Sequence, residues 1–455
     1  GRFSRRRKYL SELSRSYGNS LPFRNCNQLI FEESLTLTLL AFALGLVGGW
    51  TSPFLAKLTR PDSELPVTAI EASWIASLIQ LGRVVGAVVG SLGVAYLGSK
   101  FSVLCIGVPV VVSWILLVVA DSVAWIYVAR SFQGISTGMF FSSFPLYAGE
   151  ISNPKIRGAV IGLIMNAMAI GGLIGNLLGS LTSMSLFSFI SLVPSVAFLV
   201  SFALLPASPH YLVSRGRLDE AAKAIVWYQR DADAVAELES LKRFIDSQRE
   251  ATFKDTMREL SIPRNRKAFL LVMTVFMLLQ VGGTYAMGYY MEIILRRAGV
   301  KTVVDPGMAV VAMGVFGIAG GFSSMYTNDK FGRKAVLAGS AGGLAISLIW
   351  LPLITLSVFD FFICMGIATV PSTIVSELFP PRIKSIAACA ANMTSGLFAF
   401  ISTKTYQQMV DVMPDQYVFW FYAAMMAVLG IYTVISLPET KGKSLQEIQD
   451  MLAKR

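Results

Sequence analysis

Long apolar stretches alternate with short polar turns along most of this chain. Between Leu35 and Leu437, about a dozen of these stretches reach the roughly 20 residues that a helix needs to cross the hydrocarbon core of a membrane. We expect membrane-spanning helices near 34–55, 72–94, 102–120, 124–147, 158–181, 186–205, 268–290, 307–327, 335–354, 357–376, 386–409 and 417–437. The pattern therefore predicts an all-α membrane protein.

One long charged segment separates the first six stretches from the last six, and it divides the chain into parts. We expect a basic cytoplasmic arm at 1–33, a first bundle at 34–205, a linker at 206–267, a second bundle at 268–437 and a cytoplasmic tail at 438–455. In the linker, Leu218–Tyr228 and Val235–Ile245 carry apolar residues at helical spacing with charges between them, which predicts short amphipathic helices at the cytoplasmic membrane surface. Two sets of six spans are typical of carriers built from two repeats around a central path. Because the chain begins with Gly1, residues are expected to precede it.

Charge is scarce and unevenly placed. Charged residues make up 15% of the chain and hydrophobic residues 54%, whereas soluble domains carry about 25% charge. The net charge is +11, and the basic residues gather in the arm, the linker, a few short turns and the tail. If the helices alternate in direction, all of these fall on one side, as positively charged cytoplasmic loops do. We therefore expect both termini in the cytoplasm and a lipid bilayer, not nucleic acid, as the partner of these charges.

Few residues in the chain are suited to catalysis or metal binding. Cys26, Cys105, Cys364 and Cys389 are scattered, and His210 is the only histidine. Neither a nucleophile motif nor a phosphate-binding loop is evident. The sequence therefore predicts no catalytic residue, no metal site, no cofactor and no enzyme, and it leaves the oligomeric state open.

The two halves repeat a pattern of ionic residues at the cytoplasmic ends of their spans. Gly98-Ser99-Lys100 follows the second span, and Asp329-Lys-Phe-Gly-Arg-Lys334 follows the eighth. Glu150 precedes Arg157 by seven residues after the fourth span, as Glu377 precedes Lys384 after the tenth. The same corner of each half is therefore expected to carry charge.

These segments resemble signatures of the sugar porter family of the major facilitator superfamily. The similarity extends to Tyr147-Ala-Gly-Glu150 with Lys155-Ile-Arg-Gly158, and to Pro438-Glu-Thr-Lys-Gly-Lys-Ser-Leu445 after the last span. Pro206-Ala-Ser-Pro-His-Tyr-Leu212 is a degraded form of another signature. Gly48-Gly-Trp-Thr-Ser-Pro53, Ser73-Trp74 and Lys404-Thr-Tyr-Gln407 are similar to the facilitated trehalose transporter-like branch. The resemblance covers essentially the whole chain and implies the major facilitator fold, with twelve transmembrane helices in two six-helix bundles and short cytoplasmic linker helices.

The resemblance also implies an ionic latch between the bundles at the cytoplasmic face. Exposed ion pairs contribute only about 0–1 kcal/mol each, but a partly desolvated network can bias two states. Some of these charges could instead only fix topology. In the first half, Ala95 and Ser99 stand where an acidic residue and an arginine are usual, which weakens that part. The latch candidates are Arg130, Glu150, Arg157, Asp329, Arg333, Lys334, Glu377, Lys384 and Glu439.

A sugar site needs polar groups near the middle of the spans, because each buried polar group without a partner costs about 1–3 kcal/mol. Of the family's amides in the seventh span, Gln280 is kept, while Leu279 and Tyr285 replace a glutamine and an asparagine. The expected substrate contacts are Gln280, Asn166, Asn176, Thr284, Tyr285, Ser372, Asn392 and Arg83. Each could instead bond neighbouring helices. Tyr289 and Tyr290 match an outer aromatic pair that could gate the path or anchor the helix at the interface.

Arg83 is the most unusual of these residues because it lies inside the second predicted span. A charge there is costly unless it reaches water, pairs with an acid or meets an anionic substrate. The first span, 34–56, contains no carboxylate that could carry a proton. The leading hypothesis is therefore a facilitative plasma-membrane carrier of trehalose or hexoses that works by alternating access. Alternatives are a carrier of another small organic solute, neutral or anionic, and a non-transporting sugar sensor.

Overall fold

The computed structural model describes residues 26–151, 157–228, 238–243, 253–299, 305–350, 353–443, 447–448 and 451. All regular structure in these residues is helical, as the sequence predicts. Most of the expected basic arm, parts of the linker including residues 235–237 and 244–245 of the expected second linker helix, and the side chains of Arg157, His210 and Asp329 lie outside the described parts.

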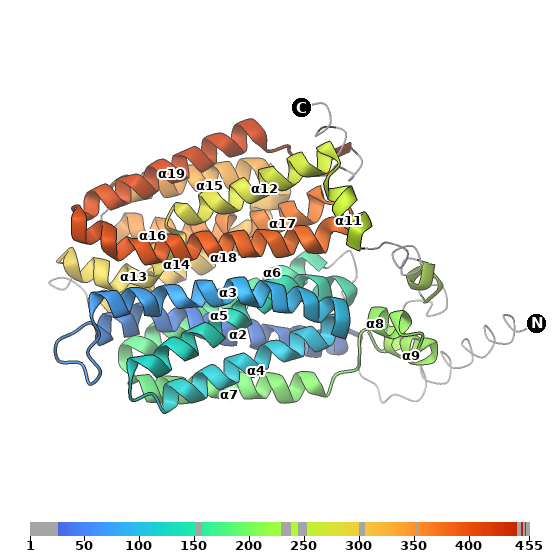
Figure 1. Cartoon of the computed structure of the whole chain (residues 1–455), viewed down its shortest axis with the longest axis horizontal. Coiled ribbons are helices and arrows are strands. Elements are labelled where there is room, and N and C mark those ends of the chain that lie inside the picture. The colour runs from blue at the N-terminus through green and yellow to red at the C-terminus, as the bar shows by residue number, and fades with distance from the viewer. Residues whose placement is uncertain are drawn as a thin grey trace, which may run out of the picture.

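The first bundle contains six long helices that lie side by side in the lower part of Figure 1. They are α2 (Cys26–Leu58), α3 (Ala69–Leu97), α4 (Ser99–Val118), α5 (Val123–Ile151), α6 (Arg157–Leu181) and α7 (Met184–Ala203). We call this set the N-bundle.

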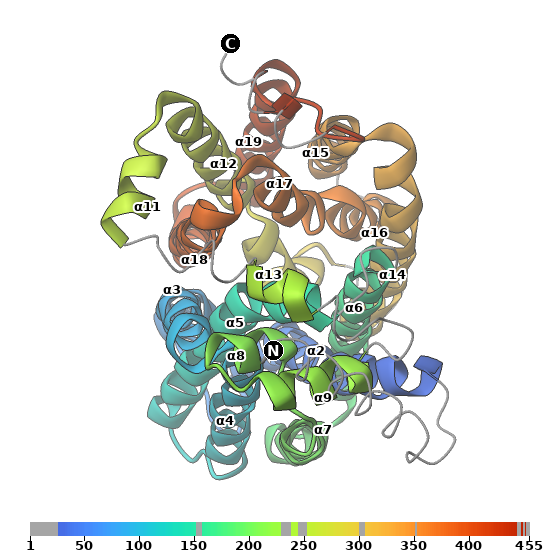
Figure 2. The same cartoon turned by 90° about the vertical axis from the view of Figure 1, so that its right-hand side faces the viewer.

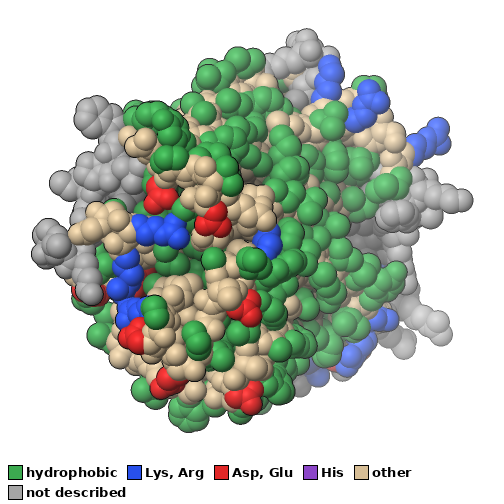
Figure 3. Space-filling view, turned by 60° about the vertical axis from the view of Figure 1, so that its left-hand side comes forward, with side chains coloured by type: hydrophobic (Ala, Val, Ile, Leu, Met, Phe, Trp, Pro, Cys, Tyr) green, Lys and Arg blue, Asp and Glu red, His purple; other side chains and the backbone are tan. Residues whose placement is uncertain are grey.

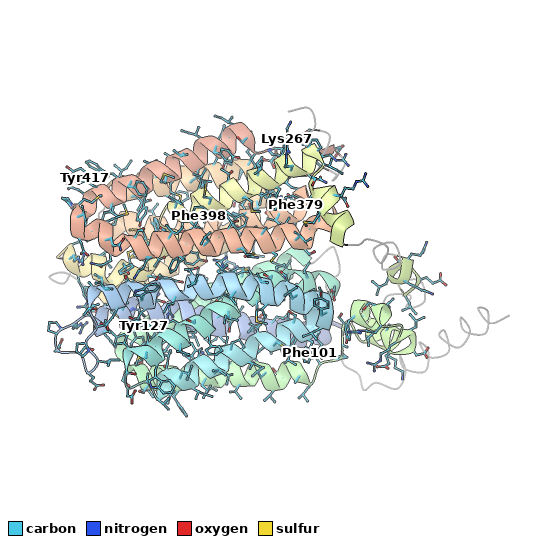
Figure 4. All side chains as sticks on the ribbon, in the orientation of Figure 1. Phe101, Tyr127, Lys267, Phe379, Phe398 and Tyr417 are labelled. Carbon is cyan, nitrogen blue, oxygen red and sulfur yellow. The ribbon has the colours of Figure 1, made fainter. Side chains whose placement is uncertain are left out.

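Short helices follow at one end of the molecule, on the right of Figure 1. They include α8 (Pro209–Ser214), α9 (Leu218–Tyr228) and α11 (Phe253–Leu260), and residues 238–243 are helical as well. We call this end the linker face and the opposite end the far face. In Figure 4, Phe101 and Lys267 lie toward the linker face, and Tyr127 and Tyr417 toward the far face.

The C-bundle also contains six spans, two of which are interrupted. Its elements are α12 (Pro263–Val281), α13 (Thr284–Arg297), α14 (Pro306–Phe331), α15 (Arg333–Trp350), α16 (Leu353–Phe362), the π-helix η2 (Ile363–Ile367), α17 (Val370–Leu378), α18 (Pro381–Val412) and α19 (Asp415–Ser436). α12 and α13 form one broken span, and α16, η2 and α17 form another.

Both interruptions fall where the hydrophobic pattern predicts continuous helices, at 268–290 and 357–376. Between α12 and α13, Gly283 has φ +78°, a left-handed conformation that glycine adopts at no steric cost. In the other span, the π-helix inserts before Val370-Pro371, where proline restricts the residue that precedes it. Apolar periodicity records the length of a span but not such breaks.

Ten of the described helical segments are long and apolar enough to cross a membrane. α5, which carries polar residues along its length, and α15, which begins with Arg333-Lys334, lie within the same two bundles and complete six spans in each. Large hydrophobic side chains are exposed along the flanks of the spans, and in Figure 3 they border the charged residues of the far face. This surface is suited to a lipid environment.

Glycines let helices pack closely within the N-bundle. A Cβ at Gly82 or Gly86 of α3 would lie 2.4 or 2.1 Å from a backbone oxygen of α5, and one at Gly171 of α6 would lie 2.2 Å from the oxygen of Phe42 in α2. These glycines therefore serve helix packing, as small residues do in membranes. Between the bundles, α3 contacts α18, α6 contacts α14 and α2 contacts α13, and Figure 2 shows the first two pairs side by side.

Candidate functional site

Polar side chains join the two bundles along the contact of α3 with α13 and α18, which we call the seam. The amide of Gln80 donates to the hydroxyl of Tyr289 at 3.0 Å. The ammonium of Lys404 donates to Ser73 Oγ at 2.7 Å and lies 3.9 Å from the ring centroid of Trp74. The hydrogen bonds described from α3 to α18 form a row. It begins with the Ser73–Lys404 pair and ends where Cys389 Sγ lies 3.6 Å from the Ala87 oxygen. These bonds therefore hold the bundles together from the far face to beyond the midpoint of α3.

Arg83 lies at the midpoint of α3 and reaches across the seam. Its Nη1 donates to the Tyr285 hydroxyl at 2.8 Å, and its Nη2 lies 3.5 Å from Asn392 Oδ1. The guanidinium lies 4.8 Å from the ring centroid of Phe141, and Asn392 Nδ2 donates to the Phe141 oxygen at 3.3 Å. We call these four residues the Arg83 cluster.

Only 5% of Arg83 is exposed, although it carries a full charge. Among the described residues no acid forms an ion pair with it. Of the three environments that the sequence leaves open for Arg83, pairing with an acidic residue is therefore not seen in the described structure. The remaining two are water and an anionic substrate.

Gln280, the amide that the resemblance keeps, is bonded within the C-bundle. Its Nε2 donates to Ser395 Oγ at 2.7 Å, and its Oε1 accepts from Thr284 at 3.2 Å. All three side chains are buried. In this conformation the group joins α12, α13 and α18, so that a sugar would have to displace one of these bonds.

The other expected substrate contacts lie apart from the Arg83 cluster. Asn166 donates to the Gly162 oxygen of its own helix and contacts Met325 Sδ of α14 at 3.9 Å. Asn176, also in α6, has a buried Oδ1 without a hydrogen-bond partner in the described structure. Ser372 is exposed on α17. The structure thus brings Arg83, Tyr285 and Asn392 together and leaves these three elsewhere.

The two tyrosines expected to act as a gate have different surroundings. Tyr289 reaches the seam through Gln80. Tyr290 points into the C-bundle, where its ring centroid lies 4.5 Å from that of Tyr406. Since adjacent residues on a helix point in different directions, only Tyr289 is placed to contact the other bundle.

At the linker face of the C-bundle, the latch candidates form a connected network. Glu377 Oε1 accepts from Arg333 Nη2 at 2.9 Å and Nε at 3.1 Å, and Glu377 Oε2 accepts from Thr440 at 2.5 Å. Glu439 accepts from the backbone amides of Arg333 and Lys334 at 3.1 and 3.2 Å, which places a carboxylate at the N-terminus of α15. We call this network the C-corner.

At the corresponding N-corner, the bonds described for Glu150 come from hydroxyl groups. Glu150 Oε2 accepts from Ser99 at 2.5 Å and from Ser208 at 2.8 Å. Lys100 donates to the Leu205 oxygen. The bonds described at each corner join helices of one bundle, and an ionic latch between bundles stays a prediction because the side chains of Arg157 and Asp329 lie outside the described parts. Lys384 is half-buried near the start of α18.

Arg130 does not lie at the linker face, and its place in the expected latch is wrong. It is fully buried in the N-bundle, near the N-terminal end of α5, which lies toward the far face. It donates to Thr51 Oγ1 at 2.6 Å and Gln133 Oε1 at 2.7 Å, and its guanidinium lies 4.8 Å from the Trp50 ring centroid. The neutral acceptors and the ring satisfy this arginine within its bundle, so that it joins α2 to α5 there.

Two polar residues escaped the sequence interpretation. Gln80 lies three residues before Arg83, so that the two share a helix face, and this spacing was visible in the sequence. Asp360 lies inside α16 and packs against α14, since a Cβ added at Gly317 of α14 would lie 3.7 Å from the Cβ of Asp360. Asp360 hydrogen-bonds to none of the described residues. An acid within an apolar run is the signal that could have identified it.

Comparisons with known proteins agree with this architecture. A family model described as "Sugar (and other) transporter" matches residues 33–452. Facilitated trehalose transporter Tret1 of Drosophila mojavensis is 29% identical over 91% of this chain and 50% of its own length, and Tret1 of Culex quinquefasciatus is 28% identical over 95% and 88%. The chain thus spans about half the length of the Drosophila relatives.

Solved structures of the proton:xylose symporter XylE share the fold. The form bound to 6-bromo-6-deoxy-D-glucose has a TM-score of 0.77 at 19% identity, covering 94% of this chain and 100% of the other. The inward open form from E. coli has a TM-score of 0.76 at 18% identity, covering 93% and 99%. With a family model that spans nearly the whole chain, the chain belongs to the family of sugar and other transporters, and it has the major facilitator fold of a multi-pass membrane protein, not an enzyme.

Proposed function

We propose that the chain is a facilitative carrier that moves trehalose or hexoses across the plasma membrane by alternating access, with both termini in the cytoplasm. The observation that supports this most is the seam, where polar groups of both bundles meet at the midpoint of their spans. A solute with several hydroxyl groups needs such donors and acceptors while it crosses the membrane. The names of the Tret1 relatives favour trehalose as the first sugar to test.

The distribution of contacts supports a rocking motion of two bodies. Within the N-bundle, glycines bring helix backbones close together, which favours a rigid unit. Across the seam, most described hydrogen bonds are made by side chains, which can exchange partners when the bundles tilt. These bonds begin at the far face, so this conformation holds the bundles together on that side. Alternating access then requires the far part of the seam to separate.

Facilitated diffusion is the simplest energetics for this chain. Residues 34–56 contain no carboxylate, so the first span has no acid that could bind and release a proton. A facilitative carrier brings the solute to the same final concentration on both sides. A transmembrane pH gradient should therefore leave the final level of sugar unchanged, whatever its sign.

Counterflow in proteoliposomes tests the proposal. Vesicles loaded with unlabelled trehalose or D-glucose should transiently accumulate the labelled sugar in a saturable manner, whereas vesicles without protein should not. The absence of saturable flux for both sugars would contradict a carrier of trehalose or hexoses, and accumulation driven by a pH gradient would contradict facilitated diffusion.

A wedge in the seam tests the rocking motion separately. A Cβ at Gly396 of α18 would lie 2.9 Å from Val84 Cγ2 and 3.1 Å from the Gln80 oxygen, so that Gly396→Leu forces α3 and α18 apart. Overpacking typically costs 1–3 kcal/mol, and if this cost falls on the conformation in which the seam is closed, uptake should fall by about 5- to 150-fold. Gly339→Leu in α15 is the control, because nothing lies within 4 Å of a Cβ at that position. Equal uptake by the two variants would argue against a moving seam.

A further inference from the structure

Arg83 places a positive charge at the centre of a span, among neutral groups. The elements that face it contribute Tyr285 from α13, Asn392 from α18 and Phe141 from α5. Gln80, on the same face of α3, is neutral as well. Since a buried charge is normally balanced by an opposite charge, the described structure leaves Arg83 without its electrostatic complement.

The hydrogen bonds of Arg83 are also incomplete. A guanidinium has five N–H donors in one plane. Nη1 has a short bond to Tyr285, and Nη2 has only the long contact with Asn392. The Nε of Arg83 is buried and has no hydrogen-bond partner in the described structure. Nε and Nη2 together form the edge of a guanidinium that binds carboxylates and phosphates with two parallel hydrogen bonds.

The aromatic rings do not replace an anion. Phe141 and Tyr285 lie 4.8 and 5.7 Å from the guanidinium carbon and attract it through their faces. A ring face accepts no in-plane hydrogen bond, so the Nε donor stays unsatisfied beside them. By contrast, Arg130 also lies over a ring but has close oxygen acceptors on Thr51 and Gln133. Neutral oxygen acceptors thus satisfy the buried guanidinium of Arg130, and Arg83 is not satisfied in this way.

We propose that Arg83 is a substrate-binding residue that takes an oxyanion, so that the carrier also accepts, and binds more tightly, sugars that bear a carboxylate or a phosphate group. This inference rests on the proposed function, because it assigns the class of solute to the same seam. Tyr285, which departs from the family pattern, and Asn392 hold the guanidinium at the midpoint of the seam. The anionic group binds the Nε and Nη2 edge, and the hydroxyl groups of the sugar reach the neighbouring amides.

A solute panel in the counterflow assay tests the inference on the unmodified chain. Labelled D-glucuronate and D-glucose 6-phosphate represent the two oxyanions, and D-glucose and trehalose are the neutral controls. We expect at least one of the anions to be accumulated, and to half-saturate the carrier at a concentration about tenfold or more below that of D-glucose, as a charged hydrogen-bonded pair implies. Flux of the neutral sugars with no flux of either anion would overturn the inference while the proposed function stands. No saturable flux of any of the four would overturn both.

Variants of Arg83 connect the anion to this residue. Arg83→Gln removes the charge and should raise the half-saturating concentration of the anion about 10- to 100-fold, with a smaller change for D-glucose. Arg83→Lys keeps the charge and should retain part of the affinity. Arg297→Gln is the control, because Arg297 is a partly exposed arginine 3.9 Å from Asp415 and lies outside the seam. If Arg83→Gln were folded and transported the anion as well as the unmodified chain does, the assignment to Arg83 would be wrong.

Discussion

The N-corner and the C-corner share a backbone but differ in their side chains. Gly98 joins α3 to α4 with φ +87° and ψ 160°, and Gly332 joins α14 to α15 with φ +87° and ψ 163°. In both corners a glutamate from the end of a later span accepts a hydrogen bond from a hydroxyl that follows the last span of the bundle, Ser208 for Glu150 and Thr440 for Glu377. The two halves are therefore repeats in their local geometry.

The contents of the corners differ in charge. The carboxylate of Glu439 lies against Gly332 and also accepts from two backbone amides of α15. The ring of Tyr211 occupies the corresponding position against Gly98. Arg333 pairs with Glu377, but the residue at the place of Arg333 in the N-corner is Ser99. The two corners thus share a glycine and a bond from a hydroxyl to a glutamate, while the described pair of an arginine at the start of a span with that glutamate belongs to the C-corner.

The largest effects are expected from the two glycines, whose conformation the corners share. Non-glycine residues with this φ and ψ are strained by about 1–3 kcal/mol, and a clash adds a similar amount, so that Gly98→Ala and Gly332→Ala should each lower the free energy of unfolding by about 2–4 kcal/mol. Gly98→Ala should cost more, because its Cβ would lie 2.4 Å from the ring of Tyr211, whereas at Gly332 the nearest group is the flexible end of Glu439. Denaturant titration in mixed micelles measures both.

Gly216→Ala is the matched control for these variants. Gly216 has φ +75°, but nothing lies within 4 Å of a Cβ there, so that only backbone strain is added. A loss at Gly98 no larger than that at Gly216 would show that the corner has room for a side chain, and would break the comparison.

The ion pair of the C-corner should have the next largest effect. Arg333→Gln removes the pair with Glu377, in which the side chains are only 19% and 25% exposed, and should lower stability by about 1–2 kcal/mol because charged hydrogen bonds in a partly dry site are lost. Arg217→Gln breaks a shorter but exposed pair with Glu220, and should cost less than about 0.5 kcal/mol. Equal losses in the mixed-micelle titration would mean that the C-corner is as well hydrated as the surface.

The spans could be predicted from the sequence because their apolar length is set by the bilayer, which acts on each helix separately. The predicted stretch 34–55 lies within α2, and 417–437 matches α19 almost to the residue. The breaks at Gly283 and in η2 could not be predicted in this way, because they depend on the backbone conformation of a few residues and on neighbouring helices.

The candidate site was less predictable because its geometry depends on how two bundles meet. That Arg83 is unusual follows from its sequence position, but its contacts with Tyr285 and Asn392 come from segments some 200 and 300 residues away. Arg130 was misplaced because the charge pattern shows that a residue is ionic without giving its depth in the membrane. Its acceptors, Thr51 and Gln133, are ordinary polar residues with no signature in the sequence.

Effects no larger than that of the ion pair are expected from the hydroxyls that the corners share, and here, as for the glycines, the N-corner variant should cost more. Ser208→Ala removes the bond to Glu150 and also the N-cap of α8, where Ser208 Oγ accepts from the Tyr211 amide at 3.2 Å, so that the loss should be about 1–2 kcal/mol. Thr440→Val keeps the shape of the side chain and leaves Glu377 bonded to Arg333, so that about 0.5–1 kcal/mol should be lost. The same titration distinguishes the two variants. If Thr440→Val cost more than Ser208→Ala, the hydroxyl would be the main stabilising group of the C-corner, and its ion pair would contribute less than the comparison of the corners implies.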